Sequence, residues 1–277
     1  MDEKSPRFVI KKILDVGTGS PLVNRLMLQF GEIVNSGFIK LDDSQKQKFN
    51  AILWECMNDL LKAEESVNEY FRIEDSAISK IASPDGVAHQ TGAYSFEDPT
   101  LDLKKHFEEF LFRAVIAVRR TIKLASIIFK TEIKGPEELK RELDKRLPSD
   151  SPHRVWIEED SGWMKDLYDL RGKAEHQLLD MSEFTVFAVK GEKPKIKLPE
   201  IKNRLVRQYM AVTLQNIFGY VEDMTALLLN QECDPSAEII QLPENERAAH
   251  RNFRYIISLK QFLLKKLEDL GDNADRP

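Results

Sequence analysis

The sequence predicts an all-α protein, a helical bundle of long helices with one inserted β-hairpin. Over four long stretches, apolar residues recur at spacings of three and four, which gives a helix one buried face. One segment, near residues 183–198, instead combines β-branched and aromatic residues with a Lys-Gly-Glu-Lys turn, a pattern typical of paired strands. Hydrophobic residues fill 42% of the 277 positions, with only 12 Gly and 12 Pro. This composition indicates a globular protein with a sizeable core.

Four long helices account for most of the expected bundle. They are expected over residues 43–72, 103–129, 206–228 and 253–270. Ser44 stands where the first of them should be capped, and Asp98-Pro99 is a stop-and-start signal ahead of the second. Shorter helices are expected at Pro21–Ser36, Pro136–Leu147 and Glu159–Leu178. The hairpin, from Phe184 to Leu198, then lies between helices.

The helices follow one another without a linker that marks a domain boundary. We therefore expect residues 1–40 to form an N-terminal segment that packs on the bundle, and residues 41–232 to form the bundle with its hairpin near 183–198. Residues 233–277 are expected to form a C-terminal helical appendage. Residues 83–99 and 148–152 carry the Gly, Pro and Ser residues of exposed loops.

Charge and cysteine content exclude several classes of protein. The 41 basic and 46 acidic side chains give a formal charge of −5, so a highly basic coating protein is excluded and nucleic-acid binding needs a local basic patch. Cys56 and Cys233 are too few for a multi-cysteine zinc site and are expected to be free thiols. Without a secretory signal or an apolar run of ~20 residues, the chain is expected in the cytoplasm, away from membranes.

Residues 14–20 resemble the glycine loop of nucleotide-dependent methyltransferases. That loop would need a third glycine where Pro21 stands, and it would need alternating strands and helices downstream. The sequence has neither feature. We interpret Gly17 and Gly19 as part of a turn ahead of the first short helix.

Arg171 and His176 form the first candidate for a catalytic site. A histidine can remove or return a proton near neutral pH, and a guanidinium can hold a phosphate through two parallel hydrogen bonds. On a helical wheel Arg171 lies within the apolar arc, and His176 lies about 140° further round. One regular helix therefore cannot direct both side chains at one phosphate, which favours a site shared between two copies of the chain, or no site. In the alternative, Arg171 pairs with Glu175 and Asp169 pairs with Lys173 at i,i+4 spacing.

A local excess of basic residues follows the candidate pair. Between Lys190 and Arg207 seven basic residues stand against two glutamates, which suits a phosphate backbone, although a solvated hairpin is a common reason for such a run. The residues that we expect to bind RNA are Lys173, Lys190, Lys193, Lys195, Lys197, Arg204 and Arg207.

At these residues the chain resembles the HEPN superfamily, helical bundles with an Arg-x4-6-His motif near a late helix. The resemblance covers the motif and, loosely, the order of long helices between residues 43 and 232. It implies a HEPN-like, metal-independent endoribonuclease that acts on RNA as a homodimer, with Arg171 and His176 as the catalytic pair. It also implies a role in a toxin–antitoxin or phage-defence system, with an antitoxin or another protein as partner. Active members usually carry Asn, Asp or His after the arginine, where this chain has Gly172. Other members are non-catalytic binding or scaffolding modules, so both functions stay open.

The remaining histidines indicate no second site. His89 falls in an expected loop, His106 on the exposed side of the second long helix, and His250 in a basic segment. Arg146 and His153 flank a proline-rich loop, and we set them aside. No cluster of His, Asp and Glu has metal-ligand spacing on one helix face, so we expect neither a metal nor a cofactor.

Overall fold

The computed structural model describes residues 17, 19–83, 88–90, 93–95, 97–148, 151–187 and 193–260. Its helical elements are η1 (Val23–Leu28, a π-helical segment), α1 (Gln29–Asn35), α2 (Asp43–Ala82), α3 (Thr100–Phe129), α4 (Pro136–Arg146), α5 (Pro152–Glu175), α6 (Val206–Gln231) and η2 (Glu244–His250, a 3-10 helix). The mostly helical class predicted from the sequence is confirmed.

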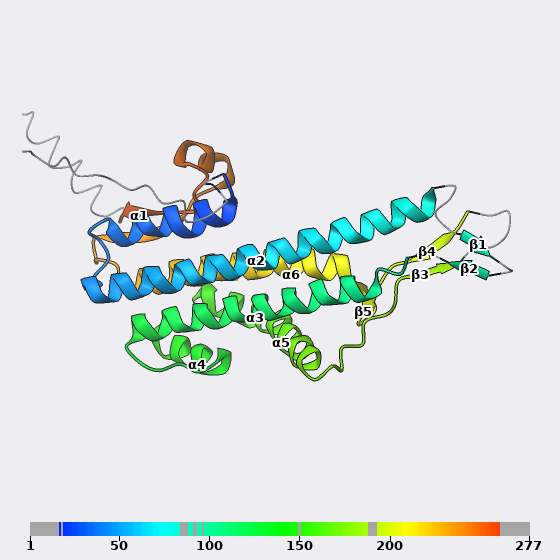
Figure 1. The fold of residues 1–277 in the computed structure, drawn as a ribbon. Helices are drawn as coiled ribbons and strands as arrows, with labels where there is room; N and C mark the ends of the chain where they lie inside the picture. Colours follow the sequence, from blue (N-terminus) through cyan, green and yellow to red (C-terminus); the bar gives the residue numbers. More distant parts are fainter. Residues whose placement is uncertain are drawn as a thin grey trace, which may run out of the picture.

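Three long helices form the body of the protein. Helices α2, α3 and α6 run alongside one another, with α4 and α5 on the α3 side and α1 on the α2 side (Figure 1). Their facing sides are filled by aromatic and aliphatic side chains such as Phe49, Phe107 and Phe110, each fully buried. Burial of this apolar surface is the main source of the bundle's stability.

The first long helix begins at a capping box rather than at the expected Ser44. The Asp42 side chain accepts a hydrogen bond from the Gln45 backbone N–H at 2.8 Å, and the Gln45 side chain accepts one from the Asp42 N–H at 3.2 Å. These two bonds satisfy backbone donors that the first helical turn leaves free.

Within the described residues, strands form four two-stranded antiparallel ladders rather than the single predicted hairpin. The strands are β1 (Ala88–Gln90), β2 (Ala93–Ser95), β3 (Thr185–Phe187), β4 (Lys195–Lys197), β5 (Glu200–Ile201), β6 (Arg204–Leu205), β7 (Ala237–Gln241) and β8 (Tyr255–Leu259), paired in chain order. The β3–β4 pair confirms the hairpin expected near residues 183–198. Because every described pair is antiparallel, the described strands do not supply the parallel sheet that a methyltransferase loop requires.

The prediction of a helix over residues 253–270 is wrong for the part of this range that the structure describes. Strand β8 pairs with β7 there, with Ile256 opposite Ile240 and Ile257 opposite Ile239. Adjacent isoleucines fit a pleated strand, because β-branched side chains pack well across a ladder. Residues 261–277 lie outside the described part of the chain.

Buried polar contacts attach the two end segments to α6. Glu222 of α6 is fully buried and accepts hydrogen bonds from Arg25 of η1, Gln29 of α1 and Arg254 ahead of β8. The Gln29 side-chain oxygen in turn accepts the backbone N–H of Arg254 and of Tyr255, at 2.5 and 2.9 Å. One carboxylate therefore joins segments that are about two hundred residues apart in the sequence. Among the described helices, none combines the length and the apolar character needed to cross a bilayer.

Candidate functional site

Arg171 lies near the C-terminal end of α5 and is largely enclosed. Its side chain is 18% exposed and forms an ion pair with Glu175, one helical turn on. Its guanidinium lies over the Phe112 ring of α3, 5.8 Å from the centroid. The buried Nε has no hydrogen-bond partner among the described residues. The contact with Glu175 is the one expected for a salt-bridged helix.

His176 lies just after the last residue of α5 and is exposed. Its backbone N–H still donates to the Gly172 carbonyl at 3.3 Å, and the chain then turns at Gln177, whose φ is 58°. This left-handed residue ends the helix. The imidazole thus stands at the helix end, open to solvent, while Arg171 faces α3.

A cavity of about 440 Å³ lies beside Arg171, between α3 and α5. The histidine in its lining is His106 of α3, which the sequence had placed on an exposed helix face; in the structure it is half-buried. Glu109, Phe112 and Glu175 also line this cavity. Sequence spacing gave no signal for this approach, because His106 and Arg171 come together only when α5 packs on α3.

Ion pairs occupy two of the predicted RNA-binding residues and one neighbouring lysine of the basic run. Lys173 contacts Asp169 at 3.1 Å, and Arg207 contacts both Glu74 and Asp75 of α2. Lys202, within the same basic run, contacts Asp166 and Asp169 of α5. Hydrogen bonds from Lys202 and Lys173 lower the pKa of Asp169. Part of the basic run therefore holds the fold together.

The other predicted RNA-binding residues in the described chain are Lys193, Lys195, Lys197 and Arg204, and all four are exposed. Lys190 lies outside the described residues.

The β3–β4 hairpin presents its lysines together with an aromatic ring. Lys195 is directly opposite Phe187 in the ladder, and paired residues share one face of a hairpin. Phe187 is 56% exposed, whereas Val186 and Ile196, on the other face, pack against the core. Lys197 is two residues further along β4 and so lies on the same face. Lys193 precedes the strand by two residues and is also exposed. We call this exposed set, Phe187 with Lys193, Lys195 and Lys197, the hairpin face.

Comparison of the chain with protein-family models, with curated proteins and with solved structures finds no match in any of the three. In the part of the chain that the structure describes, no three His, Cys, Asp or Glu side chains come together as a metal site would need.

Proposed function

We propose that this protein is a HEPN-like endoribonuclease that binds single-stranded RNA on the hairpin face and cleaves it without a metal. The observation that carries the proposal is the exposed Phe187 flanked by lysines on one face of β3–β4. An aromatic ring stacks on unpaired bases of any sequence, and lysines beside it neutralise phosphates. In the sequence, this hairpin follows shortly after the turn at His176.

In the proposed reaction His176 takes the proton of a ribose 2′-hydroxyl as its oxygen attacks phosphorus. The bond to the 5′-oxygen breaks, and a proton returns to that oxygen, which leaves a cyclic phosphate and a free 5′-hydroxyl. Arg171 holds the phosphate. Its i,i+4 pair with Glu175 contributes only about 0.3–0.5 kcal/mol, so a phosphate can displace the carboxylate. Since Arg171 and His176 face different directions on one chain, the pair is completed by a second copy in a homodimer.

Cleavage of a fluorescent single-stranded RNA in the presence of EDTA tests this function. Wild-type protein should produce a cyclic-phosphate end, and His176→Ala and Arg171→Ala should each lower the rate by a factor of about 100 or more. His106→Ala is the matched comparison, because this histidine lies in the Arg171 cavity of the same chain. Equal activity in wild type and His176→Ala would remove His176 from catalysis, and loss in His106→Ala alone would assign the proton transfer to His106.

RNA binding is tested separately by fluorescence anisotropy at several salt concentrations. Phe187→Ala should weaken binding about 5- to 150-fold, the contribution of one stacked base. Lys195→Ala should lower the salt dependence of binding by about one phosphate contact. Leu101→Ala is the control, since Leu101 is 82% exposed on α3. Binding that is unchanged in Phe187→Ala would contradict the role of the hairpin face.

A second candidate is a non-catalytic HEPN-like module that binds a protein partner such as an antitoxin, and the Arg171–Glu175 ion pair favours it. In this case Arg171 has a structural role, so Arg171→Ala should lower the melting temperature and leave partner binding unchanged. An Arg171→Ala protein as stable as wild type, with RNA cleavage lost, would exclude this candidate.

A further inference from the structure

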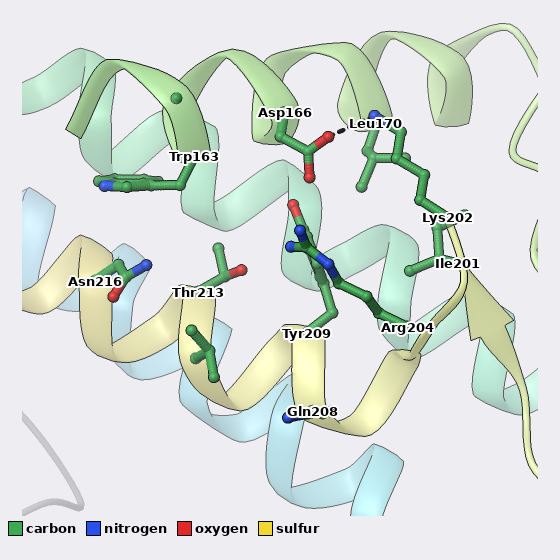
Figure 2. Close-up of a pocket in the computed structure, with 12 residues that line it drawn as sticks. Trp163, Asp166, Leu170, Ile201, Lys202, Arg204, Gln208, Tyr209, Thr213 and Asn216 are labelled. Atoms are coloured by element: carbon green, nitrogen blue, oxygen red, sulfur yellow. Dashed lines mark hydrogen bonds and ion pairs between the residues drawn. The ribbon is translucent and has the colours of Figure 1, made fainter. Parts of the chain in front are cut away.

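A second cavity lies between α5 and α6, beside the short β5–β6 hairpin (Figure 2). Both helices pack on α3, and the space between them measures about 690 Å³. This volume lies within the range of about 300–1,000 Å³ found for small-molecule sites. Its lining contains no residue of the Arg171–His176 motif, so the cavity is separate from the proposed RNA-cleaving site.

One end of the cavity carries a cation and a buried hydroxyl that lack partners. Arg204 forms no ion pair with a carboxylate of the described residues, and Figure 2 shows its guanidinium beside the tip of Tyr209. Tyr209 is only 7% exposed, and its hydroxyl has no hydrogen-bond partner in the described chain. A buried hydroxyl without a partner is unfavourable. The hydroxyl oxygen itself has almost no exposed surface, so a ligand reaches it only when the neighbouring Arg204 side chain moves aside. A ligand that then accepts hydrogen bonds from both groups would remove this penalty.

The position of Arg204 is set by a tight turn. Ile201 pairs with Arg204 across a two-residue loop, Lys202 and Asn203, whose φ angles are 50° and 60°. Positive values at both positions are typical of a type I′ hairpin turn. The turn places Lys202 against the α5 carboxylates and Arg204 at the cavity, two residues before the first residue of α6.

The charges around this end leave one positive charge uncompensated. Asp166 and Asp169 are paired with Lys202, and Asp169 also contacts Lys173. Two carboxylates therefore face three cations once Arg204 is included. The N-terminus of α6 adds a partial positive charge, so this end of the cavity favours an anion.

The opposite end is aromatic. The Trp163 indole N–H donates to Asp160 at 2.6 Å, and its ring meets Tyr220 edge-on with centroids 6.0 Å apart. These contacts hold the indole in place at the cavity wall, with Asn216 and Thr213 of α6 opposite it (Figure 2). A fixed indole suits stacking of a planar ring, and an amide beside it can hydrogen-bond to the edge of that ring.

We propose that this cavity binds a nucleoside monophosphate, with the phosphate on Arg204 and Tyr209 and the base against Trp163. The order of phosphate, ribose and base in such a nucleotide matches the order of the anion site, the polar middle and the aromatic wall along the cavity. The Asp166 carboxylate accepts hydrogen bonds from ribose hydroxyls in the middle. This binding does not depend on RNA cleavage. A 5′-phosphorylated RNA end carries the same phosphate, ribose and base as a free nucleotide. The test therefore includes both ligands.

Isothermal titration calorimetry on the full chain tests the proposal with AMP, GMP, CMP and UMP. At least one should bind with a dissociation constant below about 1 mM, and adenosine and ribose 5-phosphate should each bind at least tenfold more weakly than that nucleotide. Competition by a 5′-phosphorylated hexaribonucleotide, but not by its 5′-hydroxyl form, would identify an RNA end as the source, and no competition would identify a free nucleotide. No binding of any of the four nucleotides would overturn the proposal.

Variants assign the binding to this cavity. Arg204→Ala should weaken nucleotide binding about 10- to 100-fold, since it removes a charge-assisted contact, and Tyr209→Phe should weaken it about tenfold while keeping the ring. Arg141→Ala on α4 is the control, because Arg141 is an exposed arginine away from the cavity. Unchanged binding in Arg204→Ala and Tyr209→Phe would overturn the assignment.

Discussion

Replacing Glu222 with alanine should destabilise the protein by about 3 kcal/mol. Removing one partner of a buried ion pair costs ~3–5 kcal/mol, because the charge left behind is poorly solvated. Here Arg25 and Arg254 remain about one fifth exposed, and Arg254 keeps a contact to Asp223 at 2.8 Å. These features place the expected loss at the lower end of that range. Gln29 also loses an acceptor for its side-chain amide.

Urea unfolding followed by circular dichroism at 222 nm measures this loss. Glu32→Ala is the matched control, because Glu32 also pairs with an arginine near the C-terminal segment, Arg251, but the two side chains are 58% and 71% exposed. An exposed pair contributes at most about 1 kcal/mol. If Glu222→Ala loses no more stability than Glu32→Ala, Glu222 does not hold the end segments to α6 as described.

Three further predictions follow from individual side chains. Gly172→Asn should be at least as stable as wild type, because a Cβ at this position meets no atom within 4 Å; a lower melting temperature would contradict this. If Arg171 and His176 are catalytic, the same variant should also cleave RNA faster. Hydrogen bonds from Ser236 lower the pKa of Asp234 to about 2, so its stabilising contribution is complete above about pH 4 and disappears as the pH falls through 2. An NMR titration giving an ordinary aspartate pKa would refute this. Burial raises the pKa of the Cys56 thiol to about 12, so Cys56 should react with a thiol reagent only after unfolding; its reaction in native protein would contradict this burial.

Most of the helical framework could be predicted from the sequence. Helix α3 and helix α6 lie within a few residues of their expected ranges, since a three-and-four apolar spacing is a local property of the chain. Helix α2 continues ten residues past the expected end, to Ala82, because buried Ala77 and Ile81 extend its apolar face. The segment at β8 was misassigned, because a short apolar run has no period that separates helix from strand; its pairing with β7 decides it.

The candidate site depended more strongly on tertiary structure. The sequence identified Arg171, His176 and the basic run, and it offered the Arg171–Glu175 pair as an alternative; the pair is present. It could not indicate that His106 lines the cavity beside Arg171, or that Lys202 and Arg207 are held by carboxylates of α5 and α2. Ion pairing between distant segments depends on positions in space that no local pattern encodes.

The sequence by itself determined that this protein is built of long amphipathic helices with a basic, aromatic hairpin, because both properties follow from the order of side chains along short stretches. Only the tertiary structure decided which charges remain available to a ligand. It paired Lys173, Lys202 and Arg207 with carboxylates and left Arg204 without such a partner beside the buried hydroxyl of Tyr209. It also separated α5 from α6 enough to form a cavity. The physical reason is that a charge is free or compensated according to its neighbours in space, and those neighbours are set by packing.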